Sequence, residues 1–173
     1  YGVTDITVDN AILEEKSDFK LLTASERINH IIKYANFYGC DSEKVRGLIF
    51  CSRIEESKEL SNAFNERGFK TIALTGDNSE FERAAAIDDL ESGKLDYIFT
   101  VDIFNEGIDI PKVNQIIMLR PTQSAIIFVQ QLGRGLRKSD EKSYLTVIDF
   151  IGNYSNNYLV PIALYGDNTY NKD

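Results

Sequence analysis

The stretch VRGLIFCSRIEESKELSNAFNERGFKTIAL, residues 45–74, alternates between two hydrophobic patterns. Its first and last segments, VRGLIFCS and KTIAL, are short and almost continuously apolar, which is typical of buried strands. Between them, Leu60, Ala63 and Phe64 recur at the spacing of one helical face, and Gly68 ends the run. This stretch therefore predicts a strand, a helix and a second strand, joined by short connections.

The same cycle extends in both directions along the chain. Upstream, residues 23–39 predict a helix whose apolar positions are Ile28, Ile31, Ile32 and Ala35. Downstream, residues 79–93 predict a helix whose apolar positions are Ala84, Ile87 and Leu90. Each of these three helices has a predicted capping box at its start and a glycine at its end. The boxes are Thr23 with Glu26, Ser52 with Glu55, and Ser79 with Glu82, and the glycines are Gly39, Gly68 and Gly93.

Three further strand-like runs follow, YIFTV at 97–101, QIIMLR at 115–120 and YLTVIDF at 144–150, with an apolar helix-like run at 124–132. Strands that are apolar throughout indicate a mainly parallel sheet covered on both faces. We therefore predict a three-layer α/β domain with right-handed crossovers. A chain of 173 residues with 43% hydrophobic content is long enough for one such domain.

Composition excludes several classes of protein. The longest apolar runs, at 125–129 and 159–164, are far shorter than the roughly 20 residues that span a bilayer, so we expect a soluble protein with no membrane partner. Cys40 and Cys51 match neither a zinc pattern nor a disulfide framework, and we expect both to be reduced in the cytoplasm. The single histidine, His30, falls in a predicted helix and is expected to be structural, so no metal site is predicted. The chain opens at Tyr1 without a signal peptide, and we expect it to be excised from a longer protein.

The distribution of charge marks one part of the chain. A net charge of −8 and a pI of about 4.7 argue against a protein that holds nucleic acid by bulk electrostatics, so any polyanion must be bound locally. Residues 112–138 contain no acid at all. Their basic residues are Lys112, Arg120, Arg134, Arg137 and Lys138. We therefore predict that this segment contributes to the functional face.

Ligands of open parallel sheets lie beyond the carboxyl ends of the strands. The residues that follow the predicted strands are Ser52 and Arg53, Thr75 and Gly76, residues 102–109, residues 120–122, and the segment after Phe150. Three of these loops lead into helix starts, where free backbone N–H groups favour a phosphate. Several such positions in succession suit a strand of nucleic acid as well as a single nucleotide.

Two motifs carry more specific chemistry. In TVDIFNEGIDIP, residues 100–111, Gly107 permits close backbone approach and lies between the acceptors Asp102 and Asp109. In QQLGRGLR, residues 130–137, four positions fit the pattern Q-x-x-G-R-x-x-R, which chance would place in a chain of this length about once in a thousand, given average residue usage. The three-residue spacing puts Arg134 and Arg137 on one side of a helix.

Together these motifs resemble the second RecA-like lobe, a P-loop NTPase-like fold, of a superfamily 2 helicase or translocase. The similarity covers residues 21–150, where GLIFCSR is similar to motif IV, DIFNEGIDIP to motif V and QQLGRGLR to motif VI. Motif V is more similar to that of type I and type III restriction enzymes and excision-repair helicases than to that of DEAD-box RNA helicases, which favours DNA over RNA as a partner. The resemblance implies a connector from a first lobe at 1–20, the lobe itself at 21–150, and a tail at 151–173 that leads toward a further domain.

The resemblance also implies that ATP binds between two such lobes. The first lobe, which these 173 residues lack, would hold the phosphate loop and the carboxylates for magnesium. Arg137 matches the arginine finger and Arg134 its partner, since a guanidinium meets the oxygens of a transferring phosphoryl group bidentately. The other positions matched to the ATP site are Gly107, Asp109, Gln130 and Gly133.

On the nucleic-acid side, the resemblance implies phosphate contacts at Ser52, Arg53, Thr75, Gly76 and Asp102. Ser52 and Thr75 have an alternative role as plain helix caps, and the residues leave this open. Relatives commonly carry Thr directly before the motif V acid, but Val101 stands at that place here. Thr100 falls on the opposite side of its strand, and we do not expect it to be a contact.

No G-x-x-x-x-G-K-[ST] motif occurs in the 173 residues, so we expect this chain to hydrolyse ATP only with a first lobe. Two alternatives remain. A non-motor α/β domain that binds a nucleotide or another ligand would carry G-x-G-x-x-G after its first strand, where this chain has Ser52-Arg53-Ile54-Glu55. A helicase-like lobe without ATPase activity would act as a scaffold.

Overall fold

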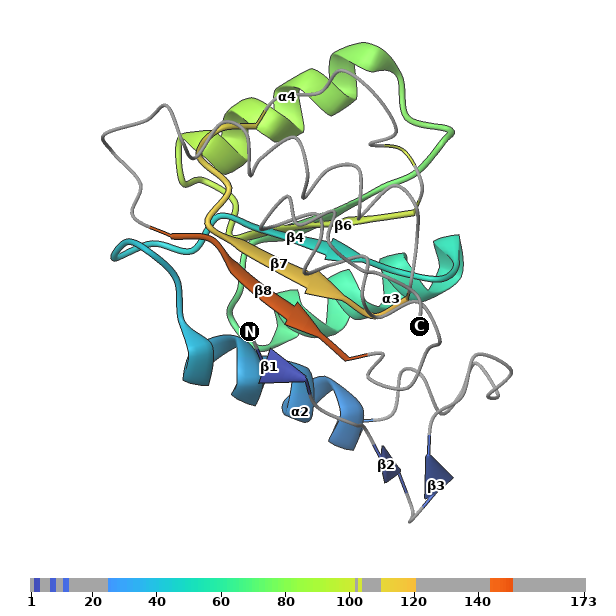
Figure 1. Ribbon diagram of the computed structural model, residues 1–173. Coiled ribbons are helices and arrows are strands. Elements are labelled where there is room, and N and C mark those ends of the chain that lie inside the picture. The colour runs from blue at the N-terminus through green and yellow to red at the C-terminus, as the bar shows by residue number, and fades with distance from the viewer. Residues whose placement is uncertain are drawn as a thin grey trace, which may run out of the picture.

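Strands and helices alternate along the chain in the computed structural model (Figure 1). The structure describes residues 2–3, 7–8, 11–12, 25–101, 103, 110–120 and 144–150. The strands are β1 (Gly2–Val3), β2 (Thr7–Val8), β3 (Ala11–Ile12), β4 (Gly47–Phe50), β5 (Thr71–Leu74), β6 (Tyr97–Thr100), β7 (Gln115–Met118) and β8 (Thr146–Asp149). The helices are α2 (Ser25–Tyr38), α3 (Ile54–Glu66) and α4 (Glu80–Glu91).

Six strands form one sheet in the order β1-β8-β7-β4-β6-β5, and every pair in it is parallel. The five strands predicted from the apolar runs all belong to it. The sixth, β1, pairs with β8 and comes from the segment that was assigned to a connector. The short strands β2 and β3 pair with each other in an antiparallel arrangement outside this sheet.

The five long strands end in register. Phe50 of β4 lies between Thr100 of β6 and Met118 of β7, while Leu74 pairs with Thr100 and Asp149 pairs with Met118. Because the strands are parallel, the loops that follow these five residues emerge at the same edge of the sheet. The predicted grouping of the loop residues at one edge therefore follows from the observed register.

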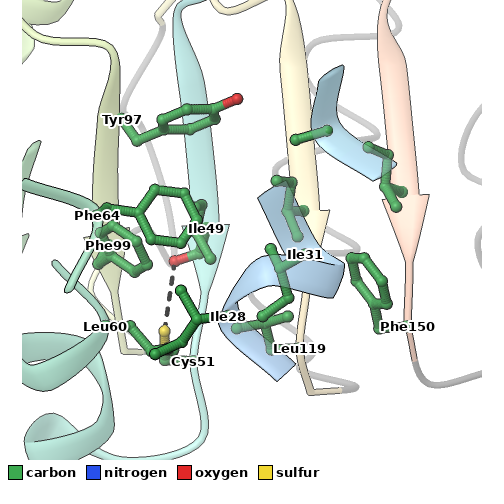
Figure 2. Close-up of a cluster of buried hydrophobic side chains, with 13 residues drawn as sticks. Ile28, Ile31, Ile49, Cys51, Leu60, Phe64, Tyr97, Phe99, Leu119 and Phe150 are labelled. Carbon is green, nitrogen blue, oxygen red and sulfur yellow. Dashed lines mark hydrogen bonds between the residues drawn. The ribbon is translucent and has the colours of Figure 1, made fainter. Parts of the chain in front are cut away.

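Alternate residues of each strand face opposite sides of the sheet and meet different helices. In β4, Leu48 and Phe50 pack with Leu90 of α4, whereas Ile49 packs with residues of α2 and α3 (Figure 2). Figure 1 shows α4 on one face of the sheet and both α2 and α3 on the other. Cys51 is a buried free thiol in the α2 and α3 cluster, and burial raises its pKa well above the ordinary value. The three-layer arrangement predicted from the apolar strands is confirmed.

Local signals fix the ends of the helices. All three glycines predicted to stop a helix adopt positive φ, with Gly68 at 91°, a conformation that glycine reaches without steric cost. At the start of α4, the Ser79 hydroxyl accepts from the Glu82 amide, and the Glu82 carboxylate accepts from the Ser79 amide at 2.7 Å. The predicted capping box of Ser79 and Glu82 is therefore confirmed. The box predicted for Thr23 and Glu26 involves Thr23, which lies outside the described residues.

The predicted capping box of Ser52 and Glu55 is wrong. The N-cap of α3 is Arg53, which has an extended backbone and no side-chain capping bond. Glu55 is exposed, and it is Glu56 that accepts from the Ser52 amide, at 2.8 Å. The helix start is one residue later than expected, and the glutamate that it uses, Glu56, is buried in an ion pair with Arg27.

The buried face of α4 also differs from the prediction. Ala86 and Leu90 are buried and Ile87 packs against them, but Ala84 is exposed. Residues 86, 87 and 90 are spaced as one helical face, and Ala84 lies about 200° from Ala86 around the helix axis. By contrast, the predicted faces of α2 and α3 are buried or partly buried as expected.

A buried side-chain network ties β6 and β7 to the end of α2. The Tyr97 hydroxyl donates to Gln115 Oε1 at 2.7 Å, and Gln115 Nε2 donates to the carbonyl oxygens of Ala35 and Gly39 at 2.9 and 2.7 Å. Gln115 thereby gives the Gly39 carbonyl a donor just beyond the helix end and gives the Ala35 carbonyl, which also accepts from the Gly39 amide at 3.1 Å, a second donor. Burial raises the pKa of Tyr97 strongly, so its hydroxyl stays a hydrogen-bond donor at all ordinary pH values.

His30 packs among aromatic rings on α2. Its ring centroid lies 4.6 Å from that of Tyr34 and 6.1 Å from that of Phe150. Within the described part of the chain, no group of His, Cys, Asp and Glu side chains is arranged to hold a metal. Burial lowers the pKa of His30, and the Lys33 ammonium lowers it further.

This lowered pKa predicts a pH dependence of stability. The unfolded chain binds a proton at His30 more readily than the folded chain does. The contribution of neutral His30 to the free energy of unfolding is therefore fully present above about pH 6.5, the ordinary pKa of histidine, and it is lost as the pH falls through the folded-state pKa. Urea unfolding at pH 7.5 and 5.5 should show this loss, and His30→Phe should remove most of it. An equal loss in His30→Phe would show that other groups cause it.

Candidate functional site

The carboxyl edge of the sheet brings two of the predicted loops together. The β4–α3 loop (residues 51–53) follows Phe50, and the β5–α4 loop (residues 75–79) follows Leu74. Both residues pair with Thr100 of β6, so the two loops flank the end of that strand. Four predicted nucleic-acid contacts, which are Ser52, Arg53, Thr75 and Gly76, therefore emerge at one edge.

The β4–α3 loop is held by two side chains and one backbone carbonyl group. The Ser52 amide donates to Glu56 Oε2 at 2.8 Å, and the Ser52 carbonyl oxygen accepts from Arg120 Nη1 at 3.3 Å. The Cys51 amide donates to the carbonyl oxygen of Thr100 at 2.9 Å. Ser52 itself is half-buried, while Arg53 is exposed at the start of α3. The loop therefore fixes its backbone and leaves an arginine side chain at the surface.

A buried ion pair lies behind this loop. Arg27 Nη1 is 3.2 Å from Glu56 Oε1, and the two side chains are only 4% and 0% exposed. Burial lowers the pKa of Arg27, and the Glu56 carboxylate opposes that shift. Because the ordinary pKa of arginine is so high, the guanidinium remains charged and keeps Glu56 paired.

The β5–α4 loop is closed by its own polar groups. The Thr75 amide donates to Asn78 Oδ1 at 2.8 Å, and the Asn78 amide donates to the Thr75 carbonyl oxygen at 3.2 Å. Arg83 Nη2 of α4 donates to the Gly76 carbonyl oxygen at 2.9 Å. Thr75 is 2% exposed, whereas Gly76 is at the surface. Thr75 therefore shapes the loop, and Gly76 is its accessible part.

The alternative role of Ser52 and Thr75 as helix caps is not observed. The N-cap residues are Arg53 for α3 and Ser79 for α4, one and four positions further along. Thr100, which was not expected to be a contact, is fully buried, and its hydroxyl has no hydrogen-bond partner.

Sequence reasoning placed Arg120 at this edge but missed the other residues that support these loops, namely Arg27, Glu56, Asn78 and Arg83. A signal existed for Glu56, since a glutamate at the third helical position commonly accepts from backbone N–H groups at the helix start. A signal also existed for Arg27, which directly precedes the buried Ile28 in a helix and so borders the apolar face.

The remaining predicted site residues lie outside the described residues. They are Asp102, Gly107, Asp109, Gln130, Gly133, Arg134 and Arg137. Of the carboxyl-edge segments, the structure also describes Leu119 and Arg120 after β7 and Phe150 after β8. Among the helices that the structure describes, none has the length and apolar character of a membrane span.

Comparisons with known proteins assign the fold and the motifs to one family. The family described as the helicase conserved C-terminal domain matches residues 25–139. IRC3 of Saccharomyces cerevisiae, named as a candidate ATP-dependent helicase, is 28% identical over 158 residues, which are 86% of this chain and 23% of IRC3. The ATP-dependent RNA helicase SrmB of Haemophilus influenzae is 29% identical over 120 residues, which are 69% of this chain and 27% of SrmB. The chain thus spans about a quarter of the length of these curated relatives.

A solved structure supports the same fold. The Escherichia coli DEAD-box protein SrmB, crystallised with regulator of ribonuclease activity A, superposes with a TM-score of 0.56 at 22% identity. The match covers 77% of this chain and 71% of the SrmB chain. The parallel sheet, the helices on both of its faces and the family match agree with one another. This chain therefore belongs to the helicase conserved C-terminal domain family and has the RecA-like fold of the C-terminal lobes of superfamily 2 helicases.

Proposed function

We propose that this chain is the second motor lobe of an ATP-dependent nucleic-acid helicase or translocase. In this role it works with a first RecA-like lobe of the same polypeptide, which holds the phosphate loop and most of the contacts to ATP and magnesium. The observation that carries the proposal is the convergence of the β4–α3 and β5–α4 loops at the carboxyl edge, in a chain that belongs to a helicase family. Parallel α/β sheets bind their ligands at that edge.

On the ATP side, we assign the arginine finger to Arg137 and a supporting role to Arg134. The QQLGRGLR motif carries both residues, and the resemblance of that motif to motif VI supports the assignment. Gly107, Asp109, Gln130 and Gly133 complete the contribution of this lobe to the ATP site. A scaffold lobe would have no use for two arginines whose three-residue spacing predicts one shared helical face.

On the nucleic-acid side, Arg53 is the principal contact, with Ser52, Thr75, Gly76 and Asp102 as further members. Arg53 is exposed at the start of α3, where the helix dipole also favours a phosphate. The acidic balance of the chain makes such a local contact necessary, because a charge of −8 repels a polyanion elsewhere on the surface. Thr75 contributes by shaping the loop that presents Gly76.

We propose DNA as the nucleic acid that is bound, because motif V is more similar to that of restriction enzymes and excision-repair helicases than to that of DEAD-box RNA helicases. RNA is the alternative, since one of the relatives is named as an RNA helicase. A direct comparison uses fluorescently labelled dT20 and U20 with the 173-residue chain.

Removing Arg53 tests the nucleic-acid side. Arg53→Ala should weaken binding of dT20 by about 3- to 10-fold in dilute salt and reduce the slope of log K against log salt by about 0.7, the value for one phosphate contact on a single strand. Fluorescence anisotropy at several salt concentrations measures both quantities.

Lys70→Ala is the matched control for this test. Lys70 is exposed and immediately precedes β5, at the amino edge of the sheet, so its removal changes the net charge equally at the opposite edge. If the two variants bind dT20 with equal affinity and equal salt slopes, Arg53 is not a contact and the nucleic-acid assignment fails.

A further inference from the structure

The buried ion pair behind the β4–α3 loop connects that loop to α2. One carboxylate oxygen of Glu56 accepts from the Ser52 amide at 2.8 Å, and the other lies 3.2 Å from Arg27 Nη1. On the other side, Arg120 Nη1 donates to the Ser52 carbonyl oxygen at 3.3 Å. Both backbone polar groups of Ser52 are therefore held by side chains, and two arginines from distant parts of the chain contribute to this arrangement.

The pair holds the chain directly before a helix whose N-cap residue makes no side-chain bond. Helices generally start with Ser, Thr, Asp or Asn, whose short side chain binds an amide of the first turn. Here the N-cap is Arg53, which makes no such bond, and the Glu56 carboxylate instead binds the amide of the preceding residue. Because the helix start is fixed from the interior, position 53 is free to carry a long, exposed cation.

Arg27 offsets a charge that would otherwise oppose phosphate binding. A lone carboxylate directly behind the loop would repel a phosphate at its outer side, and low polarity strengthens that repulsion. The Arg27 guanidinium, buried beside Glu56, cancels most of this field. A buried ion pair adds little stability compared with apolar side chains of the same size, so stability alone gives no reason for this pair.

We propose that Arg27 and Glu56 are positioning residues for nucleic-acid binding, which hold Ser52 so that Arg53 is presented to a phosphate. The inference rests on the proposed function, because it assigns a task to residues that support the same loop. Neither side chain touches the ligand. Their effect passes through the Ser52 amide, and it should therefore be separable from their effect on folding.

Two double variants separate the hydrogen bond from the charge. Single substitutions are unsuitable, because each leaves an unpaired buried charge and destabilises the chain. Arg27→Gln with Glu56→Gln gives a neutral pair that still offers an acceptor to the Ser52 amide. Arg27→Met with Glu56→Leu gives a neutral apolar pair without an acceptor. Both remove the same two charges.

The two double variants should differ in binding and agree in stability. We expect the glutamine pair to bind dT20 within about 3-fold of the parent chain, and the apolar pair to bind at least about 10-fold more weakly, since only the latter frees the loop. Thermal unfolding should give midpoints within a few degrees of each other. Hydrogen exchange of the Ser52 amide should be faster in the apolar pair alone.

The outcomes distinguish this inference from the proposed function. If both double variants bind equally well, or lose binding equally, the hydrogen bond to Ser52 has no positioning role and the inference is overturned. If the unsubstituted 173-residue chain binds neither dT20 nor U20, the proposed function is overturned, and the inference is overturned with it. A third outcome is that Arg53→Ala weakens binding while the two double variants bind alike. That result overturns the inference and leaves the proposed function in place.

Discussion

Arg137→Ala should reduce nucleic-acid-stimulated ATP hydrolysis by about 10³- to 10⁵-fold in the longer polypeptide proposed to carry this chain. A finger guanidinium stabilises charge that develops on the transferring phosphoryl group, so its loss is felt in the transition state far more than in bound ATP. The affinity for ATP should accordingly change by only a few-fold. Steady-state hydrolysis with saturating dT20 gives the first quantity, and equilibrium titration of a labelled ATP analogue gives the second.

Two further variants make the Arg137 prediction specific. Lys138→Ala removes the neighbouring cation, which the predicted helix would place about 100° further around its axis, and it should leave hydrolysis nearly unchanged. Arg137→Lys keeps the charge but not the planar, bidentate geometry, and it should remain severely impaired. If Arg137→Ala retains substantial turnover, or if Lys138→Ala is equally damaging, the finger is not Arg137.

The architecture was predictable because the amino-acid composition of each strand reflects how deeply the strand is buried. A strand that is apolar at every position has no face for water, which requires helices on both sides of a parallel sheet. β4 meets this description, with all four of its residues buried. Glycines mark the helix ends equally well, because positive φ is a property of the residue itself and needs no information from the rest of the fold.

The start of α3 was not predictable in the same way. The pattern of a capping box fits Ser52 with Glu55, while a glutamate at the third helical position equally suits Glu56, so the local sequence does not choose between the two. In the folded chain Glu56 is buried against Arg27, 29 residues earlier, and this long-range contact agrees with the observed helix start. A contact of this kind depends on how α2 packs beside α3, and periodicity within one helix does not report it.

For the candidate site, too, the positions of the loops were predictable and the contacts of individual residues were not. Sequence reasoning located the loops, because loop order follows from strand order in a parallel sheet. It did not distinguish the roles within a loop, and Thr75 proved to be buried and internally bonded while its neighbour Gly76 is exposed. The roles of Arg134 and Arg137 rest on motif resemblance, since both lie outside the described residues, and they stay predictions.

Gly47→Ala should cause a large loss of stability, because an added Cβ atom there meets its neighbours more closely than one at Gly39, Gly68, Gly76 or Gly93. A Cβ atom at Gly47 would overlap two carbon atoms of the Tyr97 ring, which lies beside it on the neighbouring strand. The ring cannot move aside easily, because its hydroxyl is bonded to Gln115 and it makes a T-shaped contact with Phe64 at a centroid distance of 5.8 Å. Overpacking and the loss of a buried hydrogen bond together cost about 4 kcal/mol, a large part of the stability of a typical domain.

Thermal unfolding measures this effect, and a loss of that size corresponds to about 8 to 16 °C in the midpoint for a domain of this length. Gly76→Ala is the control, since its added methyl group meets no atom within 4 Å and its backbone does not require glycine, so the change should stay within about 0.5 kcal/mol. Tyr97→Leu removes the ring, and adding Gly47→Ala to it should therefore cost little more. Two residues that destabilise the chain through one contact must show strong coupling in a double-mutant cycle of the free energy of unfolding. If Gly47→Ala costs as much in the Tyr97→Leu background as in the original chain, the overlap with Tyr97 is not the cause of the loss.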